Sequence, residues 1–119
     1  MGQYLPLFRP GQTVTFAVTT AVVGGQPVEV GTADRSVAPA AAGSTKYVGI
    51  PGHDAAVGDE VTIEVGKPIH LLIASGAIAR GARLETAGAG KVRTLSTGGD
   101  IGLALTSAVD GAPVEVLQK

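Results

Sequence analysis

The chain contains no cysteine and no tryptophan, and it has only two tyrosines and two phenylalanines among its 119 residues. The absence of cysteine excludes disulfide bonds, thiolate catalysis and cysteine-ligated metal ions. Because aromatic residues are so few, the core has to be built from small and branched side chains, and alanine and valine supply most of the apolar residues. Branched side chains of this kind favour β-structure.

Clusters of charge of one sign are also missing. Nine lysines and arginines stand against ten aspartates and glutamates, which gives a net charge of −1 without any basic run. A nucleic-acid-binding protein needs a clustered positive surface that displaces counterions. We therefore expect no nucleic acid among the partners.

Long hydrophobic runs are absent as well. The longest apolar stretch, residues 69–79, is interrupted by His70, Ser75 and Gly76. It is much shorter than the roughly 20 residues that span a bilayer. The N-terminal residues lack the basic and apolar regions of a signal peptide, and Pro6 stands where a myristoylation signal requires Ser or Thr. We expect a soluble protein with no membrane partner.

Short segments in which apolar and polar residues alternate are present throughout, and glycines bound them. Alternation with a period of two residues is typical of half-buried strands. We predict nine strands, at residues 13–18, 27–30, 47–50, 60–65, 68–73, 83–86, 92–95, 101–105 and 113–117. Residues 38–42 and 77–80 have a helical composition, but each is long enough for only one turn. The predicted class is all-β.

A pattern of an apolar-Gly-apolar triplet, a small-residue turn and two alternating apolar positions occurs twice at one constant spacing. The copies begin at Val48-Gly49-Ile50 and at Ile101-Gly102-Leu103, and residues 25–30 upstream align with residues 81–86. The turn before Val37 likewise aligns with residues 90–92. This repeat, over about residues 25–65 and 81–117, predicts two similar β-units packed as a small β-barrel or β-sandwich. We expect residues 13–119 to form a single β domain behind an extended N-terminal arm, residues 1–12.

Catalytic groups are scarce. His53 and His70 are the only histidines, and no second histidine or cysteine stands at a metal-ligand spacing from either. We expect His53 and its neighbour Asp54 to lie in a solvated turn. His70 alternates with Ile69 and Leu71, so we expect it on the polar face of a strand or in a subunit contact. We predict no catalysis, no metal ion and no cofactor.

The other candidates for chemistry have structural explanations. Gly88-Ala89-Gly90-Lys91 lacks the spacing and the following helix of a phosphate-binding loop, and it predicts a hairpin turn. Four serines have no nucleophile context: Ser44, Ser75, Ser96 and Ser107. Glu29 and Glu115 occupy related strand positions, and we expect both to face solvent.

The repeated pattern resembles a known family. Gly-x-x-Val-x-Val, a turn with a basic residue and Val, and then Val-Gly-Ile followed by Ala-Ala-x-Gly-Asp-Glu-Val-Thr-Ile-Glu-Val look like the small bacteriophage capsid decoration, or cement, proteins. The resemblance covers about residues 12–117. It implies a β-rich protein that assembles as a trimer on the outside of the phage head and uses an extended N-terminal arm on the shell.

The segment before the first predicted strand holds half of the aromatic residues of the chain, and its two prolines favour an extended backbone. Extended apolar arms can add to the sheet edge of another chain. Alternatively, the arm closes the barrel of its own domain. Together with the resemblance, the segment predicts capsid binding by Gln3, Tyr4, Leu5, Leu7, Phe8 and Arg9.

These observations predict a structural virion protein that is made in the host cytoplasm and binds the outer surface of a phage capsid. It would be a homotrimer that clamps major capsid protein subunits and stabilises the shell. Two alternatives stay open, another head or tail β-module of a phage and a carbohydrate-binding or adhesin-like module. Clustering of Tyr4, Phe8, Phe16 and Tyr47 in one exposed groove would favour the carbohydrate-binding module.

Overall fold

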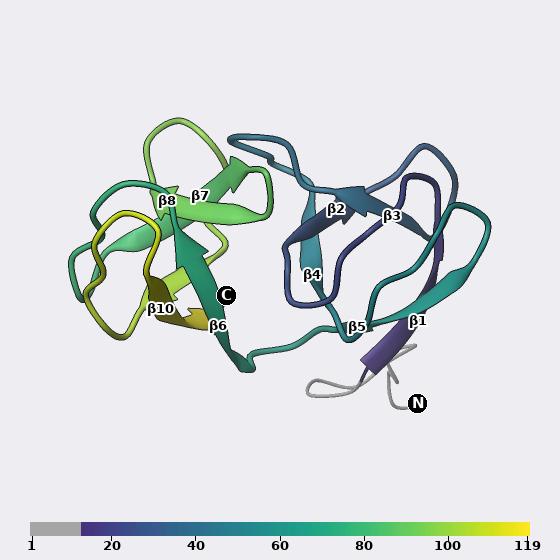
Figure 1. Cartoon of the computed structure of the whole chain (residues 1–119). Coiled ribbons are helices and arrows are strands. Elements are labelled where there is room, and N and C mark those ends of the chain that lie inside the picture. Colours follow the sequence, from purple (N-terminus) through teal and green to yellow (C-terminus); the bar gives the residue numbers. More distant parts are fainter. Residues whose placement is uncertain (1–12) are drawn as a thin grey trace, which may run out of the picture.

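A computed structural model describes residues 13–119, which form ten β-strands and no helix (Figure 1). The strands are β1 (Thr13–Val18), β2 (Val28–Val30), β3 (Ser36–Pro39), β4 (Tyr47–Pro51), β5 (Glu60–Glu64), β6 (Ile69–Ala74), β7 (Arg83–Gly88), β8 (Lys91–Thr94), β9 (Gly102–Ala104) and β10 (Pro113–Gln118). The predicted all-β class is confirmed, and each of the nine predicted strands overlaps one of these ten.

The predictions between the strands were partly wrong. Strand β3 was missed, and Ala38 and Pro39, at the start of the first expected helical turn, belong to it. In the second expected turn, Ile78 forms an isolated antiparallel bridge with Ala108 and is 2% exposed. A run of alanines is too short to nucleate a helix when neighbouring strands offer backbone partners and burial.

The strands close into two barrels of five strands each. The first has the order β1-β3-β2-β4-β5, and the second has the order β6-β8-β7-β9-β10. In each barrel the strands that come first and third along the chain pair in parallel: β1 with β3, and β6 with β8. All other strand pairs are antiparallel. The prediction of two similar β-units is therefore confirmed, since every strand of one barrel has a counterpart in the other.

Two glycines show how closely the units correspond. A Cβ atom at Gly49 would collide with the carbonyl oxygen of Glu64, and one at Gly102 would collide with that of Leu117. Both glycines lie in strands that pair with the last strand of their barrel. The Val-Gly-Ile and Ile-Gly-Leu triplets thus recur because each barrel requires the same close backbone approach.

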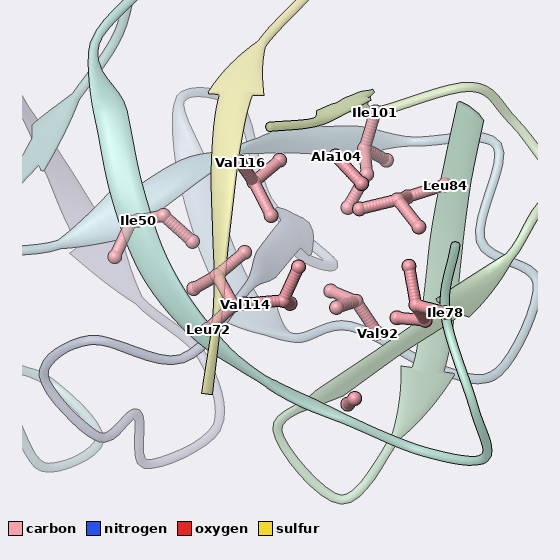
Figure 2. Close-up of a cluster of buried hydrophobic side chains, with 10 residues drawn as sticks. Ile50, Leu72, Ile78, Leu84, Val92, Ile101, Ala104, Val114 and Val116 are labelled. Atoms are coloured by element: carbon pink, nitrogen blue, oxygen red, sulfur yellow. The ribbon is translucent and has the colours of Figure 1, made fainter. Parts of the chain in front are cut away.

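Each barrel has its own core of small apolar side chains. In the first barrel the buried cluster is built from valines and one isoleucine: Val18, Val22, Val28, Val37, Val61 and Ile63. The separate core of the second barrel contains larger side chains besides its valines, among them Leu72, Leu84 and Ile101 (Figure 2). One member of this second cluster, Ile50, comes from β4 of the first barrel. The two cores are therefore joined through Ile50.

The loop between β3 and β4 also connects the barrels. The Gly43 N–H donates to the carbonyl oxygen of Thr86 in β7 at 2.7 Å, and the Ser44 N–H donates to the Thr86 hydroxyl at 3.0 Å. The β8–β9 loop meets it from the other side, where a Cβ atom at Gly98 would collide with the Cα atom of Gly43. Gly43 and Gly98 occupy corresponding positions in the repeat. Gly43 follows two residues after Ala41, whose N–H donates to Glu29 of the first barrel. Gly98 follows two residues after Ser96, whose N–H donates to Glu85 of the second barrel.

Candidate functional site

The residues predicted to bind the capsid, Gln3, Tyr4, Leu5, Leu7, Phe8 and Arg9, lie outside the described residues. The described chain begins at Thr13, which pairs with Glu64 of β5.

His53 lies in an exposed turn after β4, as expected. Its Nδ1 atom is 2.8 Å from the carbonyl oxygen of Asp54. The carboxylate of Asp54 accepts the N–H of Gly24 at 2.8 Å, so it braces a loop and does not orient the imidazole. The pair lacks the geometry of a base and its orienting acid.

The expectation of His70 on a polar face was wrong. Side chains alternate along a strand, and His70 lies on the same side of β6 as the buried Leu72 and Ala74. It is half-buried, and among the described residues its Nε2 atom has no hydrogen-bond partner. Burial lowers the pKa of His70, against the opposing effects of Gln118 and Glu64. Burial therefore favours the neutral form of the imidazole.

The Gly88–Lys91 segment forms the predicted hairpin turn. Strand β7 ends at Gly88 and β8 begins at Lys91, and the φ angles of Gly88, Ala89 and Gly90 are 82°, 53° and 78°. Successive positive φ values are typical of tight hairpins. Since a strand follows this turn, no helix N-terminus is available there for a phosphate.

A buried carboxylate that the sequence did not single out belongs to Glu85 of β7, which is 0% exposed. Its Oε1 atom accepts the N–H groups of Ser96 and Gly98 at 2.7 and 2.9 Å, and Arg93 donates to its Oε2 atom at 2.7 Å. The hydrogen bond from Ser96, with those from Gly98 and Arg93, lowers the pKa of Glu85 to about 2. This carboxylate, which is ionised at neutral pH and accepts hydrogen bonds from three residues, holds the β8–β9 loop in place.

Glu29 is the counterpart of Glu85 in the first barrel, and the expectation that it faces solvent was wrong. Its side chain is 15% exposed, and its Oε1 atom accepts the N–H of Ala41 at 3.0 Å. Lys46 lies 3.7 Å from its Oε2 atom. Glu115 is exposed, as expected. The repeat alignment of Glu29 with Glu85 was the signal that could have identified both loop braces.

A pocket of about 230 Å³ lies between the barrels. Its lining includes Ser44, Tyr47, Asp100, Gln118 and Lys119. The carboxylate of Asp100 is bound to Arg83 at 2.8 Å, and the Tyr47 hydroxyl donates to Gln118 at 2.6 Å. The side chains of Tyr47, Asp100 and Gln118 are therefore already engaged with partners in the protein. Within residues 13–119 no group of three His, Asp or Glu side chains could hold a metal ion.

The described aromatic residues do not form an exposed platform. Tyr47 lies between the barrels, where burial raises the pKa of its hydroxyl, and Phe16 packs against the first core. Tyr4 and Phe8 lie outside the described residues. Residues 13–119 also contain no helix that is long and apolar enough to cross a membrane.

Exposed apolar side chains gather on one strand. Ile69, Leu71 and Ile73 of β6 are 60%, 65% and 40% exposed. They pair with Leu117, Glu115 and Pro113 of β10, respectively, so all six side chains share the outer face of this strand pair. We name these six residues the β6–β10 face. An exposed apolar face of this kind is typical of an interaction surface.

Comparisons with known proteins agree with this picture. The model of the phage cement protein family matches residues 8–118. A solved structure, the N base of the head fiber gp8.5 in bacteriophage phi29, superposes with a TM-score of 0.70 at 18% identity, covering 91% of this chain and 93% of that chain. At this identity the likeness shows the fold. No curated protein matches the sequence.

The family match extends over both barrels. It places the chain among the capsid-binding structural proteins of phage virions. The chain belongs to the phage cement protein family.

Proposed function

We propose that this protein binds the outer surface of a phage head as a homotrimer, takes the major capsid protein as its partner, and stabilises the shell. The family match over residues 8–118 carries the proposal. The protein would be made in the host cytoplasm and would reach the virion by binding assembled heads.

Multivalency supplies the physical basis. A protomer that binds one capsid subunit weakly gains strength when three linked protomers bind a three-fold lattice point together. The resulting clamp would hold neighbouring capsid subunits against outward pressure. The thin core also favours association, because burial between copies adds stability to a small domain.

The N-terminal arm contributes contacts in this proposal. Tyr4, Leu5, Leu7 and Phe8 precede the first strand, and apolar side chains of this size gain free energy when a partner covers them. Gln3 and Arg9 add polar groups to the same segment. We assign capsid contact to all six residues.

The protein has no catalytic role in this proposal. Three acidic residues in the described part of the chain already have structural partners. Glu85 and Glu29 brace loops, and Asp100 binds Arg83. Residues 13–119 are proposed to act as one domain, since Ile50 of the first barrel packs in the core of the second.

Co-sedimentation with heads that lack the protein tests the proposal. The purified chain is expected to sediment with the heads and to raise the temperature at which they break. A cryo-EM map of decorated heads should place the density outside the shell at three-fold positions. Isolated monomers away from three-fold positions would contradict the trimer, and absence of binding would contradict the function.

A further inference from the structure

The β6–β10 face differs from its counterpart in the first barrel. By strand register, the positions that correspond to Ile69, Leu71 and Ile73 are Thr13, Thr15 and Ala17 of β1. The positions that correspond to Pro113, Glu115 and Leu117 are Glu60, Thr62 and Glu64 of β5. The same fold therefore carries a polar, anionic face in one barrel and an apolar face in the other.

This difference shows that the apolar side chains are not needed to form the barrel. The first barrel closes with two threonines and an alanine at these positions. In the second barrel Leu72 and Ala74 are buried on the inward side of β6, the side that also carries His70. The outward Ile69, Leu71 and Ile73 thus add apolar surface beyond what the core requires, and exposing them to water costs free energy.

The position of the face relative to the chain terminus indicates what covers it. Residues 1–12 precede Thr13, which pairs with Glu64 at the end of β5. Figure 1 shows the linker that runs from this end of β5 to the start of β6. From Glu64 to Ile69 the chain spans at most about 18 Å, and an extended arm of this length spans about 40 Å. A surface bound by the arm therefore lies within reach of the β6–β10 face.

We propose that the β6–β10 face is a second capsid-binding surface, which docks on an apolar patch of the major capsid protein beside the site of the arm. The proposal rests on the proposed function. Glu115 is the single charged residue of the face, and within residues 13–119 no ion pair engages its carboxylate. The capsid patch accordingly carries a lysine or arginine opposite Glu115.

When a protomer binds through one of its two contacts, the other contact is held close to the shell, so its effective concentration there is raised. They also set the orientation of the protein: the second barrel lies against the capsid, and the polar face formed by β1 and β5 remains in water. A pair of mutated chains tests this assignment.

The first variant, Ile69→Thr/Leu71→Thr/Ile73→Ala, gives β6 the outward residues that β1 already carries in the same fold. The control, Val23→Thr/Val57→Thr, removes exposed apolar side chains of the first barrel, which are 48% and 65% exposed. Circular dichroism is expected to show folded protein for both. In co-sedimentation with heads that lack the protein, the first variant should bind at least about tenfold more weakly than the wild type, a change of about 1.4 kcal/mol. The control should bind like the wild type.

Photo-crosslinking gives a second measurement that does not depend on the triple variant. Because the chain has no cysteine, Leu71→Cys and Thr15→Cys each introduce one thiol for a benzophenone probe at corresponding positions. Leu71→Cys should crosslink to the major capsid protein, and Thr15→Cys should not.

The outcomes separate this proposal from the proposed function. Undiminished binding by the triple variant would overturn the face while leaving capsid binding intact. Crosslinks from Leu71→Cys only to another copy would identify the face as a contact between protomers, and crosslinks only to residues 1–12 would show that the arm covers it; either result overturns the proposal. Failure of the wild type to sediment with heads would overturn both.

Discussion

The hydroxyl of Tyr47, in the first strand after the β3–β4 loop, donates a 2.6 Å hydrogen bond to Oε1 of Gln118 in the last strand of the second barrel. The amide nitrogen of Gln118 donates in turn to the carbonyl oxygens of Gly66 and Glu64, at 3.1 and 3.4 Å. One buried glutamine thus ties β4, the linker and β10 together.

Tyr47→Phe is expected to destabilise the protein, because the buried Oε1 atom of Gln118 loses its donor while the ring is retained. The expected loss in the free energy of unfolding is about 1–2 kcal/mol. Urea unfolding followed by circular dichroism measures it. Stability equal to that of the wild type would show that water replaces the tyrosine hydroxyl.

Ile50→Ala is expected to leave a cavity in the core of the second barrel although the residue belongs to the first. The expected cost is about 2–5 kcal/mol, against about 0.5–1.5 kcal/mol for Ile50→Val. If the barrels form one domain, calorimetry should show a single transition at a lower temperature. Two separate transitions in the wild type would contradict the single domain.

Gly49→Ala and Gly102→Ala are expected to be destabilising to a similar extent, by about 1–3 kcal/mol each, because the added Cβ meets a carbonyl oxygen of the neighbouring strand. Gly52→Ala is the control. A Cβ there comes no closer than 3.7 Å to the Thr62 oxygen. Thermal unfolding of the three variants measures the effect, and equal stability of Gly49→Ala and Gly52→Ala would contradict it.

Glu85 predicts a dependence of stability on pH. Its pKa is about 2 in the folded protein against an ordinary 4.5, so the folded state favours the ionised form. The stabilisation is complete above pH 4.5 and is lost as the pH falls from 4.5 towards 2. Glu85→Gln should lower stability at pH 6 and should lose less stability than the wild type between pH 5 and pH 3.

The control for this prediction is Glu60→Gln, at an exposed position of β5. Urea unfolding at each pH gives the three curves. An unchanged pH dependence in Glu85→Gln would show that other carboxylates dominate acid unfolding.

Removal of residues 1–10 is expected to abolish decoration of heads and to preserve folding, because both barrels lie within residues 13–119. Circular dichroism and co-sedimentation with heads are the measurements. Loss of folding would show that the arm is part of the barrel, and retained decoration would place the binding surface elsewhere.

The strands that the sequence predicts best are those with one apolar and one polar face. Thr13–Val18 alternates strictly, and its bounds were predicted without error. Strand β3 was missed because it is short, ends in Pro39 and runs into alanines, so local pattern and propensity disagreed with its position in the barrel. Its alignment with residues 90–92 was the available signal, since a repeated unit has to supply the same strand twice.

The site was harder to predict than the fold. Apart from His70, the residues on both faces of β6 are apolar, so alternation alone cannot separate the core residue Leu72 from the exposed Leu71. Glu85 appeared to be an ordinary strand acid, because its donors come from later in the chain: Arg93 from β8, and Ser96 and Gly98 from the loop after it. Burial and exposure of this kind depend on closure of the barrel, which the one-dimensional pattern does not contain.

The close approach of Gly43 and Gly98 has a consequence for symmetry. The two loops correspond in the repeat, but their hydrogen bonds differ: the Gly43 N–H donates to Thr86 of the second barrel, whereas the Gly98 N–H donates to Glu85 of its own barrel. Core packing is unequal as well, because Ile50 of the first barrel packs in the core of the second, whereas the first core is built from residues of its own barrel. The contact between the barrels is therefore directional, and each protomer presents two different halves to any surface that it binds.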